Sequence, residues 1–454
     1  MLPGGRPKAA LPPISEPMTE PATQRKIDPA RRPASAMALD VSAPGNPAHR
    51  EWAEAGLDAP DIKAIRRYRL GRLRAELAER DCAGAVLFDP LNVHYATDCP
   101  NMQVWCMHNA VRYAFVATEG PVVLFDFHSC AHLSADLDLI DETRPAIPFF
   151  YYQVGDREEE MAARWAGEIA ELIRAAGGNR LAVDKCEIAG IDALRAAGID
   201  VVAGQDATEH ARKIKHARKI KHADEIKTMR RAIHACETGM AAMWDALTPG
   251  ITENQLWSIL HQANIARGGE WIETRLLSSG PHTNPWFREC SDRVIEAGDI
   301  VSFDTDLVGP YGYCSDISRS WVTGGGRPTN EQAALHAIAM DQLETNIALL
   351  KPGMGFLEFG EKSYRLPEEY RANRYSVVAH GIGQCDEYPD VRYPEDAAKF
   401  GYDGVFEPGM CVCLESYVGR EGGHEGVKLE RQVVITETGV EVLDRFPLDL
   451  VPEL

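Results

Sequence analysis

The sequence predicts an α/β domain followed by a larger α+β domain. Strand-like and helix-like segments alternate over residues 46–205, as in α/β proteins. In the second half, two long amphipathic helices begin and end with the same signals, roughly one hundred residues apart. Between those helices lies an Asp-rich pair of β-prone runs, Asp299–Trp321. A chain of 454 residues is long enough to give both domains a substantial core.

Composition and charge exclude several classes of partner. The chain has 48 Lys and Arg against 68 Asp and Glu, a net charge of −20, which argues against nucleic acids and anionic membranes. No apolar run reaches the roughly 20 residues that span a bilayer. The eleven cysteines are scattered and form no CxxC pair, which is typical of reduced thiols. We therefore expect a cytoplasmic protein, with Cys411 and Cys413 packed as small apolar residues on a strand.

The first domain is expected to begin after a flexible tail. Residues 1–45 are rich in Pro, Ala and Arg and lack the apolar core of a secretory signal. Residues 46–205 then form the first domain. Its hairpin signal is Thr118-Glu119-Gly120, which joins the β runs RYAFVA and PVVLFDF. The other expected elements are a helix over Asp61–Arg80, a buried strand Ala83–Phe88, a helix Arg157–Ala175, a strand RLAVD, a helix near Ile191–Ala197 and a strand IDVVA.

A charged connector, residues 206–222, follows the first domain. It contains ARKIKH twice in tandem, at 211–216 and 217–222, and seven Lys or Arg residues lie between Arg212 and Lys227. We interpret this cluster as the solvated face of a helix, which the second copy lengthens. A site for an anion is the alternative.

The second domain, residues 223–454, shows a repeated pattern of helix signals. A long amphipathic helix begins at Ala223 and stops at Pro249-Gly250, and Thr252–Gln255 is a capping box that opens the next helix. The same two signals recur later in the chain: a capping box at Thr329–Gln332 opens a helix, and Pro352-Gly353 ends it. This repeat predicts two pseudo-symmetric halves around a central sheet.

Six residues in or beside β-prone segments form a candidate dinuclear metal centre. Hard oxygen ligands combined with one imidazole suit a divalent transition metal better than calcium or a structural zinc ion. Glutamates on otherwise apolar strands also need a partner for their charge. One of the two Asp residues in the DTD motif has an alternative role as a cap of the turn before Gly309-Pro310. The predicted ligands are Asp304, Asp306, Asp316, His380, Glu415 and Glu430.

These motifs resemble the pita-bread metallohydrolases, the family of methionine aminopeptidase, aminopeptidase P, prolidase and creatinase. The resemblance rests on SDISR, HGIG, a Glu before Ser and a Glu on the last long strand, in this order. RLRAEL and DPLNVHYATDC also resemble the creatinase-type N-terminal domain. The resemblance implies two metal ions bridged by Asp316 and Glu430. It also implies a homodimer, in which residues such as Trp105 approach the partner's active site.

Two departures from the peptidases of this family point to another reaction. Asp386, in HGIGQCDEYPD, occupies the position of their second histidine, and Trp286 and Phe287 lie near where a further histidine falls. Without these histidines the site is poorly equipped for peptide hydrolysis. The chain also resembles the members of the family that are lyases on dimethylsulfoniopropionate (DMSP), which form dimethyl sulfide and acrylate. That resemblance assigns an active-site role to Tyr375 and favours iron over manganese, cobalt or zinc.

The predicted chemistry is a β-elimination. A metal holds the substrate carboxylate, and Asp386, desolvated near the metals, acts as the base. The alternative for Asp386 is a surface position in the DEYPD loop. Aromatic faces at Trp105, Trp286 and Tyr375 hold the cationic leaving group, although each ring has an ordinary place in a core as its alternative. Other candidates for the cage are Trp271, Tyr311 and Tyr313. An Xaa-Pro metallopeptidase or creatinase-like amidinohydrolase is the alternative function, and an inactive metal-binding relative is a third.

Overall fold

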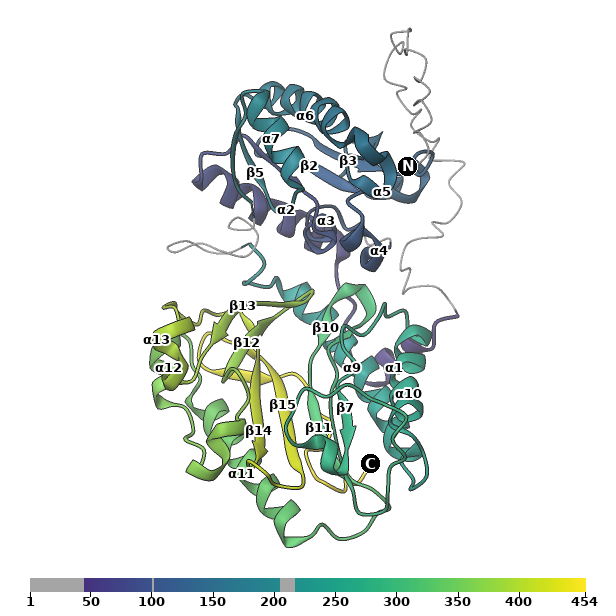
Figure 1. Cartoon of the computed structure of the whole chain (residues 1–454), viewed down its shortest axis with the longest axis vertical. Coiled ribbons are helices and arrows are strands. Elements are labelled where there is room, and N and C mark those ends of the chain that lie inside the picture. The colour runs from purple at the N-terminus through teal and green to yellow at the C-terminus, as the bar shows by residue number, and fades with distance from the viewer. Residues whose placement is uncertain (1–44, 100–101, 205–216) are drawn as a thin grey trace, which may run out of the picture.

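The computed structural model describes residues 45–99, 102–204 and 217–454. The expected tail, apart from its last residue, and the first ARKIKH copy lie outside this part. Figure 1 shows a smaller upper part built on one sheet and a larger lower part, joined by the segment that follows residue 216. The domain boundaries stay a prediction. No helix in the described ranges is both long and apolar enough to cross a membrane.

The upper part is built on a six-stranded mixed sheet with the order β4-β3-β2-β1-β5-β6. The predicted hairpin at Thr118-Glu119-Gly120 is confirmed, because β2 and β3 pair in antiparallel fashion. One face of the sheet packs against α6 and α7, and the other against α2 and α3. Strands buried on both faces become continuous apolar runs, which explains the sequences of β2 and β3. The strands are β1 Gly84–Leu87, β2 Tyr113–Ala117, β3 Val122–Asp126, β4 Glu142–Pro145, β5 Arg180–Val183 and β6 Asp200–Ala203.

Of the helices described before residue 204, α2 to α7 lie in the upper part, whereas α1 lies in the lower part beside α9 (Figure 1). Two of them, α3 and α4, lie at the junction with the lower part in Figure 1. Helix α1 packs below the junction, where the indole of Trp52 donates to the backbone oxygen of Arg231, 3.2 Å away. The helices are α1 Pro47–Glu54, α2 Ile62–Glu79, α3 Pro90–Thr97, α4 Gln103–His108, α5 Tyr151–Val154, α6 Glu158–Ala175 and α7 Ile188–Ala196.

The second ARKIKH copy contradicts the predicted solvated helix. Residues 217–222 form a turn followed by extended chain, and Ile220 makes an isolated bridge to Met410. Its cations Arg218, Lys219 and Lys221 are 4%, 7% and 6% exposed. These side chains can be buried because carboxylates of the lower part compensate their positive charge. Periodicity along the sequence does not reveal such distant partners.

The helix signals of the lower part are confirmed in detail. Thr252 and Gln255 form a reciprocal capping box at the start of α10, and Thr329 and Gln332 form another at the start of α11. A third box, of His222 and Glu225, opens α9. The helices are α9 Ala223–Ala246, α10 Glu253–Ala266, α11 Asn330–Leu349, α12 Phe356–Lys362 and α13 Pro394–Phe400.

The strands of the lower part form its centre, with helices on the outside. A three-stranded sheet β11-β8-β7 lies beside a five-stranded sheet β13-β12-β14-β15-β16, and β9 pairs with β10. Helices α9 and α10 flank the first sheet, and α11, α12 and α13 flank the second (Figure 1). The strands are β7 Leu277–Ser279, β8 Ile300–Asp304, β9 Leu307–Val308, β10 Cys314–Ser315, β11 Ser318–Val322, β12 Ala379–Ile382, β13 Asp386–Val391, β14 Cys411–Gly419, β15 Gly426–Ile435 and β16 Val440–Val442.

Candidate metal centre

The structure brings all six predicted ligands together between the two sheets of the lower part. Asp304 ends β8, Asp306 follows it, and Asp316 lies between β10 and β11. His380, Glu415 and Glu430 come from β12, β14 and β15. These residues fall into three overlapping groups, one of which also contains Cys413, and within each group the ligand atoms lie within 4.8 Å of one another. Segments more than one hundred residues apart in the chain therefore converge on one cluster.

Strand register explains this convergence. Glu415 and Glu430 are directly paired across β14 and β15, so their side chains leave the sheet on the same face. His380 pairs with Cys413, two residues before Glu415, and lies on the same face. Asp306 has a positive φ of 34°, a region that Asp tolerates, and its carboxylate accepts a hydrogen bond from the hydroxyl of Thr274.

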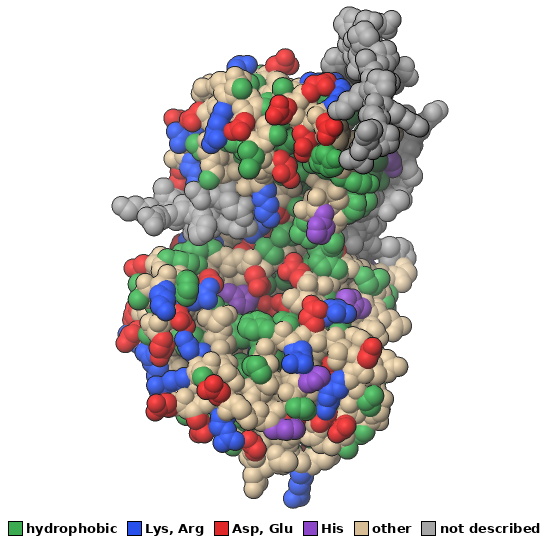
Figure 2. All heavy atoms as spheres, viewed as in Figure 1, with side chains coloured by type: hydrophobic (Ala, Val, Ile, Leu, Met, Phe, Trp, Pro, Cys, Tyr) green, Lys and Arg blue, Asp and Glu red, His purple; other side chains and the backbone are tan. Residues whose placement is uncertain are grey.

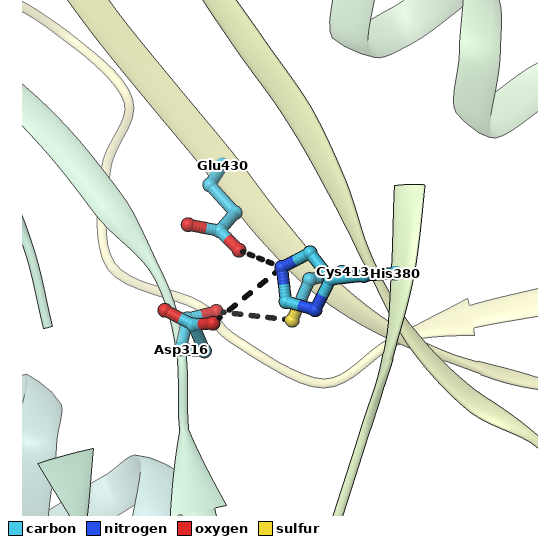
Figure 3. Close-up of side chains that lie close together, drawn as sticks. All are labelled: Asp316, His380, Cys413 and Glu430. Carbon is cyan, nitrogen blue, oxygen red and sulfur yellow. Dashed lines mark hydrogen bonds and ion pairs between the residues drawn. The ribbon is translucent and has the colours of Figure 1, made fainter. Parts of the chain in front are cut away.

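Figure 3 shows how His380 faces this cluster. Its Nε2 lies 3.3 Å from Glu415 Oε1, 3.5 Å from Glu430 Oε1 and 3.6 Å from Asp316 Oδ2. Burial by itself lowers the pKa of His380, but the surrounding carboxylates, Asp386 first among them, outweigh burial and hold the pKa well above its usual range. Nε2 points to the candidate ligands, and Nδ1 lies 3.2 Å from the backbone oxygen of Gly381.

Burial also shifts the pKa values of the acidic ligands. It raises the pKa values of Asp304 and Asp316 well above their usual range, and the nearby Glu430 carboxylate adds to the effect. Glu430 is itself buried, which raises its pKa, but Lys428 and His380 outweigh burial and hold this pKa well below its usual range. Burial and repulsion thus disfavour the charged forms of Asp304 and Asp316, whereas nearby cations keep Glu430 charged.

Lys428 is a member of the cluster that the sequence reasoning missed. Its side chain is fully buried, and Nζ lies 2.6 Å from Glu415 Oε2, 2.9 Å from Asp304 Oδ2 and 3.1 Å from Glu430 Oε2. It also donates to the hydroxyl of Ser318, 2.7 Å away. The sequence did contain a signal for this position. Residues 428 and 430 are two apart on a strand, so their side chains lie on the same face of the sheet.

Cys413 is a second residue that the prediction placed only in the core. It is buried as expected, but its sulfur also lies within 4.8 Å of ligand atoms of Asp316, His380 and Glu430. Figure 3 shows the sulfur beside Asp316, whose backbone oxygen accepts from the thiol at 3.5 Å.

The residues of the cluster fit a divalent transition metal. Carboxylate oxygens and one imidazole are the donors that such ions take, and the cluster provides enough of them for two ions. Within the described ranges, several buried carboxylate oxygens have no hydrogen-bond partner, as expected of groups shaped for an ion. These oxygens are Asp304 Oδ1, Asp316 Oδ1, Glu415 Oε1 and Glu430 Oε1.

Asp386, the predicted base, lies at the edge of the cluster and is not desolvated as expected. Its side chain is 62% exposed, and Oδ1 lies 3.6 Å from His380 Nδ1. The first residue of an edge strand at a cavity mouth keeps contact with solvent, which agrees with the surface position that the sequence left open for Asp386. Asp386 therefore faces the outer nitrogen of the histidine, whose inner nitrogen faces the candidate ligands.

A cavity of about 400 Å³ opens beside Asp386. Tyr375 and His380 line it near the cluster, and β13 supplies much of the remaining wall. The mouth combines carboxylates with aromatic rings, which suits a small polar substrate. The residues that line the cavity are Tyr375, Ser376, Val377, His380, Asp386, Glu387, Tyr388, Asp390 and Tyr402.

The predicted aromatic residues divide between two places. Trp286 and Tyr375 belong to one buried cluster with Leu276 and Tyr417. Lys428 Nζ lies 4.6 Å from the ring centre of Tyr375 and 5.9 Å from that of Trp286, so these rings already face a cation. Trp105 lies on α4 in the upper part, where its ring packs against Phe127. Trp271, Tyr311 and Tyr313 pack in another core cluster, below the junction.

The fold and the candidate metal centre together define a protein of the pita-bread class, in which the candidate ligands converge from the central strands. Residues 227–437 match the metallopeptidase family M24. The chain is 44% identical over 439 residues to the dimethylsulfoniopropionate lyase DddP of Roseovarius nubinhibens, covering 94% of this chain and 97% of that protein. It is 42% identical to the dimethylsulfoniopropionate lyase DddP of Roseobacter denitrificans, again covering 94% of this chain and 97% of that protein. The chain belongs to the DddP family.

Solved structures of peptidases share this fold. The Xaa-Pro dipeptidase of Bacillus anthracis superposes with a TM-score of 0.69 at 19% identity, over 84% of this chain and 98% of that one. The prolidase of Pyrococcus horikoshii gives a TM-score of 0.63, also at 19% identity, over 84% and 99%. The predicted pita-bread architecture is thereby confirmed.

Proposed function

We propose that this chain is a metal-dependent carbon–sulfur lyase that cleaves DMSP to dimethyl sulfide and acrylate. Its high identity to two DMSP lyases over nearly the full length of both supports this function. The observation that carries the proposal is Asp386 beside His380, with an oxygen 3.6 Å from Nδ1 at the mouth of the cavity. An exposed carboxylate next to the ligand cluster is placed to receive a proton from a bound substrate.

The proposed reaction is an elimination across two carbons of the substrate. Asp386 takes a proton from the carbon next to the carboxylate, the electrons of that C–H bond form the C=C bond of acrylate, and those of the C–S bond leave with sulfur as neutral dimethyl sulfide. Bound metal ions would hold the substrate carboxylate and stabilise the negative charge that develops beside it. The six predicted ligands, Asp304, Asp306, Asp316, His380, Glu415 and Glu430, would hold these ions, and we propose iron as the metal.

Tyr375 and Trp286 have binding roles in this scheme. Burial raises the pKa of Tyr375 above its ordinary value, so the hydroxyl keeps its proton and is able to donate a hydrogen bond. Tyr375 also lines the cavity, whereas Trp286 packs against Tyr417 with the two rings tilted. We keep Tyr375 as an active-site residue and Trp286 as part of its support. Trp105 is proposed to act across a dimer interface.

A homodimer in the cytoplasm is the proposed setting. Four large apolar side chains on and beside α4 are strongly exposed, where Figure 2 shows hydrophobic side chains gathered near the junction, and such a patch marks an interaction surface. They are Met102, Val104, Trp105 and Met107, which are 47%, 47%, 40% and 52% exposed. All eleven cysteines are free, which agrees with a reducing compartment.

Peptidase activity is the second candidate, because the superposable structures include an Xaa-Pro dipeptidase and a prolidase. Purified protein loaded with iron or manganese is incubated with DMSP and, separately, with an Xaa-Pro dipeptide. We expect dimethyl sulfide and acrylate in equal amounts and no free amino acids. Dipeptide cleavage without dimethyl sulfide would favour the peptidase, and metal binding without either activity would favour an inactive relative.

A further inference from the structure

We propose that helix α3 and the connector 217–222 position Asp386 for proton transfer, through a buried ion cluster on Glu387. This inference rests on the proposed function, because it takes Asp386 as the base. It gives the upper part of the same chain a direct role at the active site.

Asp386 has little packing of its own to hold it. Its side chain is 62% exposed, whereas the side chain of the next residue, Glu387, is only 3% exposed. Both residues border the cavity, but neighbouring residues on a strand point to opposite sides, so the Glu387 carboxylate turns into the protein and that of Asp386 toward solvent. The direction in which Asp386 points is therefore set by what holds Glu387.

Two cations of the connector hold Glu387. Arg218 Nε lies 3.2 Å from Glu387 Oε2, and Lys221 Nζ forms an ion pair with Oε1. All three side chains are 3% exposed, so solvent screens these pairs little. The fit is tight, since a Cβ atom at Gly383 would lie 2.7 Å from Glu387 Oε1.

Helix α3 holds the same loop from the other side. Arg218 donates to Asn92 Oδ1 of α3 at 3.1 Å, and its other terminal nitrogen lies 3.5 Å from the sulfur of Cys385. Gln384 donates through Nε2 to His94 Nδ1 of α3, also at 3.1 Å. Residues 384–387, which follow His380 and include the base, are thus bonded to α3 directly through Gln384 and indirectly through Arg218 of the connector.

Small displacements of Asp386 matter for the reaction. Proton transfer needs the carboxylate within hydrogen-bond reach of the substrate carbon, and a misplacement of about 1 Å costs up to roughly a hundredfold in rate. A loosened Glu387 would change the orientation of Asp386 while leaving the candidate metal ligands on their strands. The signature of positioning is therefore a lower kcat at unchanged metal content.

The chain offers a matched control in the same connector. Lys219 pairs with Glu407 at 2.5 Å, which joins the connector to the segment before β14 instead of the loop before Asp386. Glu387→Gln and Glu407→Gln each remove one carboxylate charge that faces the connector. Lys221→Met removes the positive charge at this position, whereas Lys221→Arg keeps it. Comparing the two variants tests whether the charge itself matters.

The test compares these variants as metal-loaded full-length proteins. We expect Glu387→Gln and Lys221→Met to lower kcat for DMSP by about tenfold or more, with KM within about threefold and metal content unchanged. We expect Glu407→Gln to stay within about twofold of wild type and Lys221→Arg to recover most of the rate. Equal losses in Glu387→Gln and Glu407→Gln, or wild-type kcat in Glu387→Gln, would overturn the proposal.

Hydrogen exchange gives a readout that does not depend on activity. We expect faster exchange of the amides of residues 383–391 in Glu387→Gln and in the milder variant Asn92→Ala, and wild-type exchange there in Glu407→Gln. Wild-type exchange in the first two variants would overturn the positioning role. A wild-type protein without lyase activity would instead refute the proposed function, and the exchange data would still decide whether α3 and the connector hold this loop.

Discussion

The ammonium group of Lys428 lies 2.6 Å from the carboxylate of Glu415, inside the cluster of candidate metal ligands. Both side chains are buried, and Lys428 also contacts Asp304 and Glu430. Uncompensated carboxylates cannot be buried cheaply, so a resident cation lets these strands pack around the site. Lys428 thus reduces the repulsion among residues that the proposed chemistry needs close together.

Replacing Lys428 by Met should destabilise the metal-free protein by about 3–5 kcal/mol, because buried carboxylates lose their cation. Bound metal supplies positive charge in its place, so we expect a clearly smaller loss in the loaded protein. The free energy of unfolding, measured in denaturant with a chelator and with saturating metal, checks this. Equal losses under both conditions would show that Lys428 does not neutralise the metal ligands.

Asp316→Ala should lose most of the bound metal, since Asp316 faces His380 and Glu430 at the centre of the cluster. We also expect the chelated variant to unfold at or above the temperature of the chelated wild type. Burial and Glu430 hold the pKa of Asp316 well above its usual range, which marks its charge as unfavourable without metal. Elemental analysis and thermal unfolding provide the two measurements. Full metal occupancy in the variant would remove Asp316 from the centre.

Glu270 should make stability depend on pH. Burial, and to a lesser extent Asp98, raises its pKa from 4.5 to about 8 in the folded protein. The folded state therefore holds a proton that the unfolded state releases, so this contribution is complete below about pH 4.5 and is lost as the pH rises to about 8.

Glu270→Gln keeps a neutral side chain at every pH and provides the comparison. We expect the variant to gain stability over wild type by on the order of 1–3 kcal/mol between pH 5 and pH 8.5. Denaturant unfolding at several pH values gives the difference. Parallel stability curves for the two proteins would contradict the assignment.

Local signals in the sequence predicted much of the fold. The capping boxes at Thr252 and Thr329 depend on contacts within four residues, so they are readable without any tertiary structure. The hairpin at Thr118-Glu119-Gly120 is equally local. The order of the motifs along the chain predicted the candidate metal ligands. Strand pairing then brings these residues together in the folded protein.

The connector and Asp386 required the tertiary structure. Arg218 and Lys221 are basic residues in a basic segment, and nothing near them in the sequence identifies Glu387, more than 160 residues away, as their partner. The exposure of Asp386 likewise depends on the shape of the cavity mouth. Lys428, unlike Arg218 and Lys221, had a local signal, because a residue two positions before Glu430 on a strand lies on the same face. A buried lysine among metal ligands is nevertheless too uncommon to predict.

The most direct test of the proposed chemistry is the rate of dimethyl sulfide release by metal-loaded protein, before and after Asp386→Asn. We expect the wild type to release dimethyl sulfide with an equal amount of acrylate. The variant should be at least about a hundredfold slower with its metal content unchanged, since it loses only the proton acceptor. Wild-type rates in Asp386→Asn, or loss of its metal along with its activity, would contradict the assignment of Asp386 as the base.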